Sequence, residues 1–372
     1  MNLTDKALLP GRRDFGKMAL GSALGGVLAH PADSAARAPL PKLDPGIKIS
    51  VQSPIDPTDD DLLFAQQLGT GWVNLEPRST IEPTAENYIK WRDRYASAGL
   101  KVWNISNDRV HCMEEVTLNL PGRDAKIEEY KQFLRTTAKA GLHYVTYAHM
   151  GNGIWSSARE TVRGSRGRAL DMNSPERRGS WNKIWHEPLS HGRQFSEQEI
   201  WDNYTYFIKQ VVPLAEELGI RIGIHPDDPP VPVLAGVPRC IFASFDGYKR
   251  ALEIADSPNI GMCLCVGCWA EGGKLMGKDV FETIHYFAAR KKLFKVHFRN
   301  VTAPLPHFVE TFPDNGYMDM YKVMKTLRQV NFDGVIIADH VPPMVGGNRS
   351  GTAYCVAYMR ALRDRANQEV KA

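Results

Sequence analysis

From residue 47 onward the chain alternates short apolar runs with longer amphipathic segments, and this alternation restricts the folds it can adopt. Eight runs have the short length, the flanking Gly, Pro or Asn, and the Val, Ile and aromatic content that are typical of strands. These predicted strands span residues 47–54, 71–77, 100–107, 143–151, 220–228, 259–267, 293–301 and 333–341. Segments with a period near 3.6 lie between them, at residues 86–98, 125–140, 197–218, 245–255, 280–291, 318–329 and 352–365.

Three of the predicted helices end in the same way, with Gly99, Gly141 or Gly219 followed by Leu or Ile. A glycine at this point is typical of the left-handed residue that closes a helix before the next strand. Eight strand–helix units of this kind predict an α/β protein, a closed (β/α)8 TIM barrel. The alternative is an open doubly wound sheet, but no G-x-G-x-x-G follows the first strand, which weakens its dinucleotide-binding version.

One connection is much longer than the others. Residues 152–195 are rich in Arg and Gly and show little periodicity, and a loop of this length in a compact domain is usually functional or disordered. We therefore expect a long insertion after strand 4. In a barrel it would lie over the carboxyl-terminal mouth, where active sites form.

The first 38 residues are expected to be a targeting segment rather than part of the fold. Arg12 and Arg13, with Phe15 and Lys17, precede a weakly apolar run at residues 18–29 and then small residues at 33–38. This order resembles a twin-arginine export signal, and the run is too short to span a membrane stably. The sequence thus predicts a signal at 1–38, a single catalytic domain at 39–372, and a periplasmic or exported mature protein without a membrane segment.

Composition narrows the classes of partner. The chain is 43% hydrophobic and 24% charged, which is ordinary for a globular protein and argues against disorder or a coiled coil. The formal net charge is +4, and the expected signal carries part of that surplus, so the body is nearly neutral. A near-neutral body does not indicate nucleic acid as the partner. Assembly into a homo-oligomer is left open.

The last four predicted strands each end in a side chain that can bind a metal. These residues are His225, Cys265, His297 and Asp339. Any one of them alone would be read as a polar strand end that bonds to a loop. Four at equivalent positions instead predict one divalent metal ion, because imidazole, thiolate and carboxylate are all ligands for such ions. Mn or Fe is favoured, and Co or Zn is also compatible.

Strand alternation places Lys295, His297 and Arg299 on one face. Arg299 is therefore predicted to lie above the metal and face the mouth, where a guanidinium suits a substrate carboxylate. A salt bridge to an acidic loop residue is the alternative. Asp339 and His340 point in opposite directions in a regular strand, so both reach the site only if the chain turns there.

The cysteines near strand 6 form the spacing C-x-C-x2-C, at Cys263, Cys265 and Cys268. No further Cys or His follows closely enough to complete a structural zinc knot. An exported protein can form disulfides, so a pair involving Cys268, Cys240 or Cys112 is left open. Cys265 is the only one of the six cysteines that we predict as a metal ligand.

Several motifs together resemble the mannonate dehydratase family of metal-dependent TIM-barrel enzymes. The matching segments are residues 225–230, 264–267, 297–301, 314–320 and 339–340, with 153–171 similar to that family's mouth insertion. The resemblance implies a hydro-lyase of hexuronate breakdown that converts D-mannonate to 2-keto-3-deoxy-D-gluconate. It implies metal ligation by His225, Cys265, His297 and Asp339, and catalytic roles for His340 and Tyr354.

The sequence departs from the family pattern at three places. Residues 76–80 stand where the family has a Ser- and His-containing segment, and Ala338 precedes Asp339 where Pro is usual. The start of the last helix, which carries Tyr354, differs too. These departures leave open a different sugar acid as the substrate.

Dehydration of a sugar acid requires removal of the proton next to the carboxylate, stabilisation of the resulting enediolate, and protonation of the departing hydroxyl. His340 suits either proton-transfer role near neutral pH, with Tyr354 as its partner, and the sequence does not assign acid and base.

Two other functions compete with this one. A metal-dependent sugar isomerase or epimerase on the same fold would favour several carboxylates around the metal, whereas this set has one. A non-catalytic sugar-acid binder would not need His340.

Overall fold

The computed structural model describes residues 38–76, 82–179 and 188–371. The predicted signal at 1–38 lies outside these residues except for Ala38, so its assignment stays a prediction. Among the described residues, no helix is long and apolar enough to cross a membrane.

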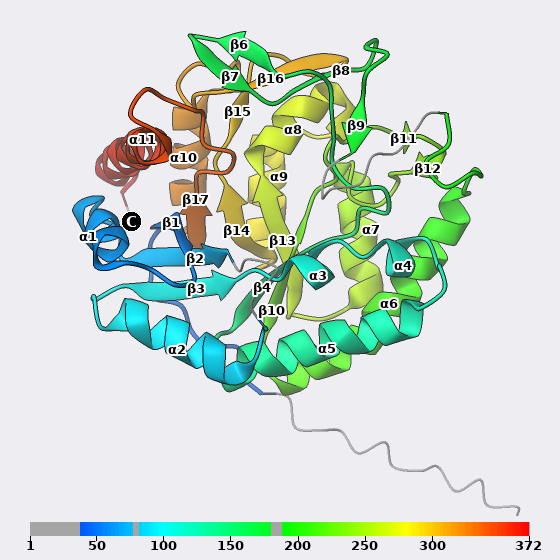
Figure 1. Cartoon of the computed structure of the whole chain (residues 1–372), viewed down its shortest axis with the longest axis horizontal. Coiled ribbons are helices and arrows are strands. Elements are labelled where there is room, and N and C mark those ends of the chain that lie inside the picture. Colours follow the sequence, from blue (N-terminus) through cyan, green and yellow to red (C-terminus); the bar gives the residue numbers. More distant parts are fainter. Residues whose placement is uncertain (1–37, 77–81, 180–187, 372) are drawn as a thin grey trace, which may run out of the picture. The chain divides into compact units, whose positions relative to one another are not determined.

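Eight parallel strands form the central sheet, and their positions agree closely with the predicted ones (Figure 1). They are β1 (Lys48–Pro54), β2 (Trp72–Glu76), β3 (Lys101–Ile105), β4 (Tyr144–Ala148), β10 (Arg221–His225), β13 (Ile260–Cys265), β14 (Leu293–His297) and β17 (Val335–Ile337). Their order in the sheet is β3-β2-β1-β17-β14-β13-β10-β4. The first and last strands in the chain, β1 and β17, therefore pair with each other, as a barrel requires.

The ring is completed between β3 and β4, which are the two ends of the hydrogen-bonded order. There, a single parallel bridge joins Cys112, which follows β3, to Ala148 at the end of β4. The result is a nearly closed (β/α)8 barrel, which confirms the predicted fold class.

Helices follow the strands and pack against the barrel. The main ones are α1 (Asp59–Gln67), α2 (Ala85–Ala96), α5 (Arg123–Lys139), α6 (Glu197–Glu217), α7 (Phe245–Ala255), α9 (Val280–Ala289), α10 (Met320–Gln329) and α11 (Asn348–Glu369). Seven of these match the predicted helices, and α1 was not predicted. The sequence signal for α1 is a capping box. The Thr58 side chain accepts a hydrogen bond from the Asp61 backbone N–H, and the Asp61 carboxylate accepts one from the Thr58 backbone N–H.

The predicted glycine helix ends are present. Gly99, Gly141 and Gly219 have φ of +73°, +68° and +62°, which is the left-handed region that side chains with a Cβ rarely enter. One or two residues separate each glycine from the next strand, so each sets the point at which a strand enters the barrel.

The described part of the insertion after β4, residues 152–179 and 188–195, contains short strands. These are β5 (Trp155–Ser156), β6 (Glu160–Val162), β7 (Ser165–Gly167), β8 (Ala169–Asp171) and β9 (Arg178–Gly179). The strand β8 pairs antiparallel with β16 (His307–Thr311), which lies in the connection after β14. Figure 1 shows β6, β7, β8 and β16 grouped together at the top of the view. Leu170 of β8 and Phe308 of β16 form a small buried core with Ala270 and Val301.

The seventh barrel strand is shorter than predicted. It ends at His297, and Asn300–Val301 form a separate strand, β15, that pairs antiparallel with β16. The alternation predicted through residue 301 therefore stops at His297. This change decides where Arg299 points.

Candidate metal centre and active site

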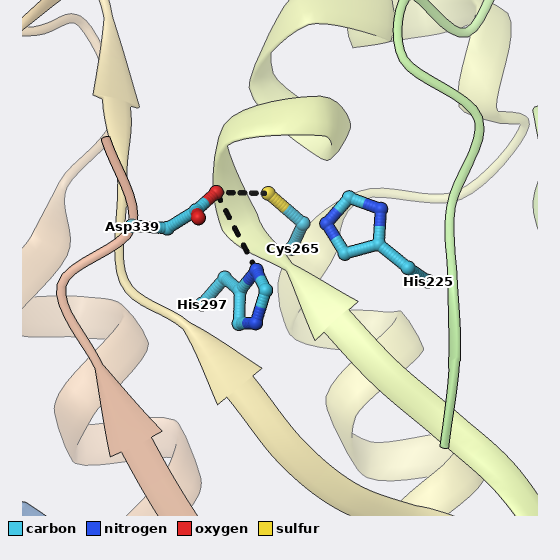
Figure 2. Close-up of side chains that lie close together, drawn as sticks. All are labelled: His225, Cys265, His297 and Asp339. Atoms are coloured by element: carbon cyan, nitrogen blue, oxygen red, sulfur yellow. Dashed lines mark hydrogen bonds and ion pairs between the residues drawn. The ribbon is translucent and has the colours of Figure 1, made fainter. Parts of the chain in front are cut away.

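The four predicted ligands come together at one end of the barrel. His225, Cys265 and His297 are the last residues of β10, β13 and β14, and Asp339 lies two residues beyond the end of β17. Cys265 is in register with His297, and His297 with Ile337, so the strands deliver these side chains at the same level. One ligand-type atom from each residue lies within 4.8 Å of the others, and Figure 2 shows the four side chains converging.

The spacing of these atoms fits a metal ion. Tetrahedral bonds of about 2.0–2.3 Å place ligand atoms roughly 3.3–3.8 Å apart. Asp339 Oδ2 lies 3.4 Å from His297 Nδ1 and 3.8 Å from Cys265 Sγ. Apart from this ion pair with Asp339, the buried His297 Nδ1 has no partner of hydrogen-bond geometry among the described residues, so it is placed to bind a metal.

The orientation of His225 also suits ligation. Its Nδ1 lies 2.8 Å from the Pro226 carbonyl oxygen, which can only accept, so Nδ1 carries the proton and Nε2 is left to bind. Figure 2 shows this ring turned toward Cys265. The residues therefore fit a divalent metal with two imidazoles, one thiolate and one carboxylate.

The surroundings favour the anionic forms that ligate. Burial raises the pKa of the Cys265 thiol, but hydrogen bonding from Cys268 and the charge of Arg299 outweigh it, and the net pKa lies well below its usual range. Burial likewise raises the pKa of Asp339, and the charges of His340 and His297 hold it well below normal. Both groups are thus ready to bind a cation without a proton to remove.

The structure corrects the predicted position of Arg299. Its side chain is 1% exposed and is not part of the cavity wall. The guanidinium donates to Glu271 Oε1 at 2.7 Å and to Glu310. The physical reason is the early end of β14, because Arg299 no longer follows the strand alternation and turns into the protein. The alternative salt bridge to acidic residues is what forms.

Arg299 belongs to a buried charge cluster that the sequence analysis missed. Its members are Arg168 of the insertion, Asp228 after β10, Glu271 of α8 (Val266–Gly272), Arg299 and Glu310 of β16. Asp228, Cys268 and Glu271 would by spacing make a second candidate metal group. The two guanidinium groups already bond to its carboxylates, so this group needs no ion for charge balance.

His340 reaches the cavity because the chain turns at that residue. Its φ is +51°, in the left-handed region that a residue with a side chain seldom adopts and that often marks functional sites. Its Nδ1 lies 2.7 Å from Glu310 Oε1. Burial alone would lower the pKa of this imidazole, but Asp339 and Glu310 raise it to about 9. The predicted turn is present, and it lets Asp339 and His340 face the same site.

A cavity of about 620 Å³ opens beside the candidate ligands. Its wall includes His225, His297, Asp339 and His340, together with Gln52, Glu76, Asp108 and Lys295. Burial raises the pKa of the carboxyl groups of Glu76 and Asp108. The cavity therefore combines a metal site, an imidazolium, carboxylates and a lysine, which is a set suited to proton transfer on an anionic substrate.

Tyr354 is not part of this cavity wall. It lies in the first turns of α11, where its ring contacts Phe312 and the Arg163 guanidinium lies 5.4 Å from the ring centre. Its hydroxyl bonds with Arg163 and Asp314. The structure does not bring Tyr354 to His340, and its catalytic role stays a prediction.

The comparisons with known proteins agree with this geometry. A family profile described as D-mannonate dehydratase (UxuA) matches residues 76–176 and 168–369. A mannonate dehydratase of Streptococcus suis is 31% identical over 74% of this chain and 79% of its own length. A second, from Thermotoga neapolitana, is 29% identical over 74% of this chain and 82% of its own.

Solved structures extend the comparison. The crystal structure of a Streptococcus suis mannonate dehydratase superposes with a TM-score of 0.74 at 26% identity, over 88% of this chain and 99% of that one. An L-ribulose 3-epimerase superposes with a TM-score of 0.54 at 12% identity, over 87% of this chain and 96% of its own, and shows a shared fold alone.

Proposed function

This chain belongs to the D-mannonate dehydratase family, and from that premise we propose that it removes water from D-mannonate to give 2-keto-3-deoxy-D-gluconate. The observation that carries this function is the convergence of two imidazoles, a thiolate and a carboxylate on one barrel end, in a chain that matches the family from residue 76 to 369. The ligands are His225, Cys265, His297 and Asp339. We propose Mn²⁺ or Fe²⁺ as the resident ion, because a mixed N, S and O set accepts either.

A divalent metal bound there would polarise the substrate and stabilise the negative charge that develops next to its carboxylate. The remaining steps fall to side chains of the cavity. His340, held by Glu310 and with a pKa of about 9, is protonated near neutral pH and is suited to donate a proton to the departing hydroxyl. Glu76 and Asp108 are the candidates for the base, because burial raises the pKa of each carboxyl and so makes it more basic.

Substrate orientation calls for a cation at the cavity wall, and Arg299 is instead buried against Glu271 and Glu310. The Lys295 amino group lines the cavity, donates to Asn104 Oδ1 at 3.2 Å, and belongs to the same strand as His297. We propose that it binds the substrate carboxylate. Replacement by Met would then raise KM for the sugar acid more than it lowers kcat.

The test combines metal analysis with product detection. The purified protein, loaded with Mn²⁺ or Fe²⁺ in separate samples, is incubated with D-mannonate and with a panel of other aldonic acids, and 2-keto-3-deoxy products are identified by NMR. Cys265→Ser should lose the metal and the activity. Cys240→Ser is the matched control, because Cys240 lies outside the ligand group.

A sugar isomerase or epimerase is the competing outcome. An enzyme of that kind would rearrange or epimerise sugars without forming a keto-deoxy acid. If the protein does so and no aldonic acid reacts, the proposed dehydratase function is refuted. The single carboxylate in the ligand set argues for dehydration.

A further inference from the structure

One sequence motif has only half of its residues in the proposed metal centre. Cys265 and Cys268 form a Cys-x-x-Cys pair at the junction of β13 and α8. The Cys265 sulfur accepts a hydrogen bond from the Cys268 backbone N–H at 3.4 Å. Cys265 belongs to the metal ligand group and Cys268 does not, so the second thiol is available for another role.

The two sulfurs share a neighbour. Arg299 Nη2 lies 3.4 Å from Cys265 Sγ and 3.2 Å from Cys268 Sγ. Both thiols are thus within hydrogen-bond reach of one nitrogen atom, and both side chains are buried. Cys265 is the cap residue before α8 and Cys268 lies in the first turn of that helix, so their side chains leave the backbone close together. A disulfide needs Cβ atoms about 3.5–4.5 Å apart. A small local shift would therefore close the bond.

We propose that Cys265 and Cys268 form a reversible disulfide when the metal-free protein meets a peroxide, and that this disulfide prevents metal binding. The switch concerns a ligand of the proposed metal centre and does not depend on which sugar acid is the substrate. It would turn the metal site off under oxidising conditions and protect Cys265 from irreversible oxidation.

The chemistry balances with hydrogen peroxide as the oxidant. The Cys265 thiolate attacks one peroxide oxygen, and the O–O bond breaks. Hydroxide departs as the leaving group, and Cys265 becomes a sulfenic acid. The Cys268 sulfur then attacks the Cys265 sulfur, the S–S bond forms, and the S–O bond breaks, with water leaving. Two thiols lose two electrons and two protons, and the peroxide is reduced to two waters.

The geometry of the candidate ligands determines both how peroxide reaches the Cys265 sulfur and how a bound metal would protect that sulfur. Asp339, whose carboxylate lies 3.8 Å from the Cys265 sulfur, is part of the cavity wall, so a small oxidant that reaches the metal position reaches the sulfur. A bound metal would occupy the sulfur electron pair that attacks the peroxide. The metal-loaded protein should therefore resist the reaction.

The test compares metal-stripped protein with protein reloaded with Mn²⁺, each treated with hydrogen peroxide. Free thiols are counted after denaturation, and the intact mass and the tryptic peptide of residues 251–274 are measured. This peptide carries Cys263, Cys265 and Cys268. We expect the stripped protein to lose two of its thiols and the mass of two hydrogen atoms, to bind no Mn²⁺ afterwards, and to recover both thiols and Mn²⁺ binding with dithiothreitol.

Two variants identify the pair. Cys263→Ser is the matched control on the same peptide and should still form the disulfide, whereas Cys268→Ser should not. If Cys268→Ser fails to fold, fragmentation of the wild-type peptide still locates the bond. The proposal is overturned if the stripped protein keeps all of its thiols, if Cys265 is oxidised further while Cys268 stays reduced, if Cys263 is the partner, or if Mn²⁺ gives no protection. None of these measurements needs a substrate, so failure here is distinct from failure of the dehydratase assay.

Discussion

The buried position of Arg299 predicts that its loss damages the fold before it damages substrate binding. Removing one partner from a buried ion cluster typically costs about 3–5 kcal/mol, because the opposite charges stay buried without compensation. Here Glu271 and Glu310 would lose a shared donor, which would leave Arg168 beside both carboxylates and His340 beside Glu310. Burial raises the pKa of Glu271 well above normal, so this carboxyl can take up a proton and lessen the cost. We therefore expect Arg299→Met to lose about 3 kcal/mol, the low end of the range.

The assay is equilibrium unfolding in urea, with KM measured on the folded fraction. A loss of about 3 kcal/mol lowers the midpoint by roughly 1 M if the slope is about 3 kcal/mol per M. Arg349→Met is the matched control, because Arg349 pairs with Asp60 and Asp61 at the surface and its loss should leave the midpoint nearly unchanged.

One result would refute this reasoning. If Arg299→Met unfolds at the same urea concentration as the wild type but shows a large increase in KM, then Arg299 binds the substrate after all. The buried cluster would in that case rearrange when the substrate enters.

Four further predictions follow from the site and the chain. His340→Asn should keep the fold and the metal but lower kcat by about 10²–10⁴-fold. Steady-state kinetics and metal analysis measure this, and near-normal turnover would contradict the catalytic role of His340. Chelation of the metal should abolish activity. Metal added back at about 100 times its Kd should restore activity and raise the free energy of unfolding by about 2.7 kcal/mol. Activity that survives complete chelation would exclude a catalytic metal. Burial lowers the pKa of His149 to about 3 in the folded protein, so the unfolded chain binds an extra proton below about pH 6.5. Stability should therefore fall by about 1.4 kcal/mol per pH unit toward pH 4 from this group, and His149→Gln should reduce that slope in urea titrations. N-terminal sequencing of protein from its native host should show cleavage after about residue 38, and an intact Met1 in a cytosolic fraction would reject the export signal.

The barrel could be predicted because each strand and most helices carry their own periodic signal. The convergence of the candidate ligands could be predicted for the same reason, since His225, Cys265 and His297 are the final residues of strands whose ends meet in any parallel barrel. The position of Arg299 could not be predicted, because nothing in Val296–Val301 marks the end of β14 at His297. Alternation holds only while a strand lasts.

The charge cluster shows a different limit. Arg168 and Glu310 lie 142 residues apart and in segments without helical periodicity, so no local pattern pairs them. What brings them together is the antiparallel pairing of β8 with β16, together with the cost of leaving either charge buried alone. A sequence signal existed only for Asp228, within the His-Pro-Asp-Asp motif after β10.

Glu310 connects these two parts of the molecule. It accepts hydrogen bonds from Arg168 of the insertion, from Arg299 after β14, and from His340 after β17. Because a buried carboxylate is stable only while its donors stay in place, the same interactions that fix the insertion over the barrel also fix the imidazole of His340. The sequence can therefore name the catalytic candidate from its position beside Asp339. It cannot name the residue that orients it, because that residue acts only after three distant segments have packed together.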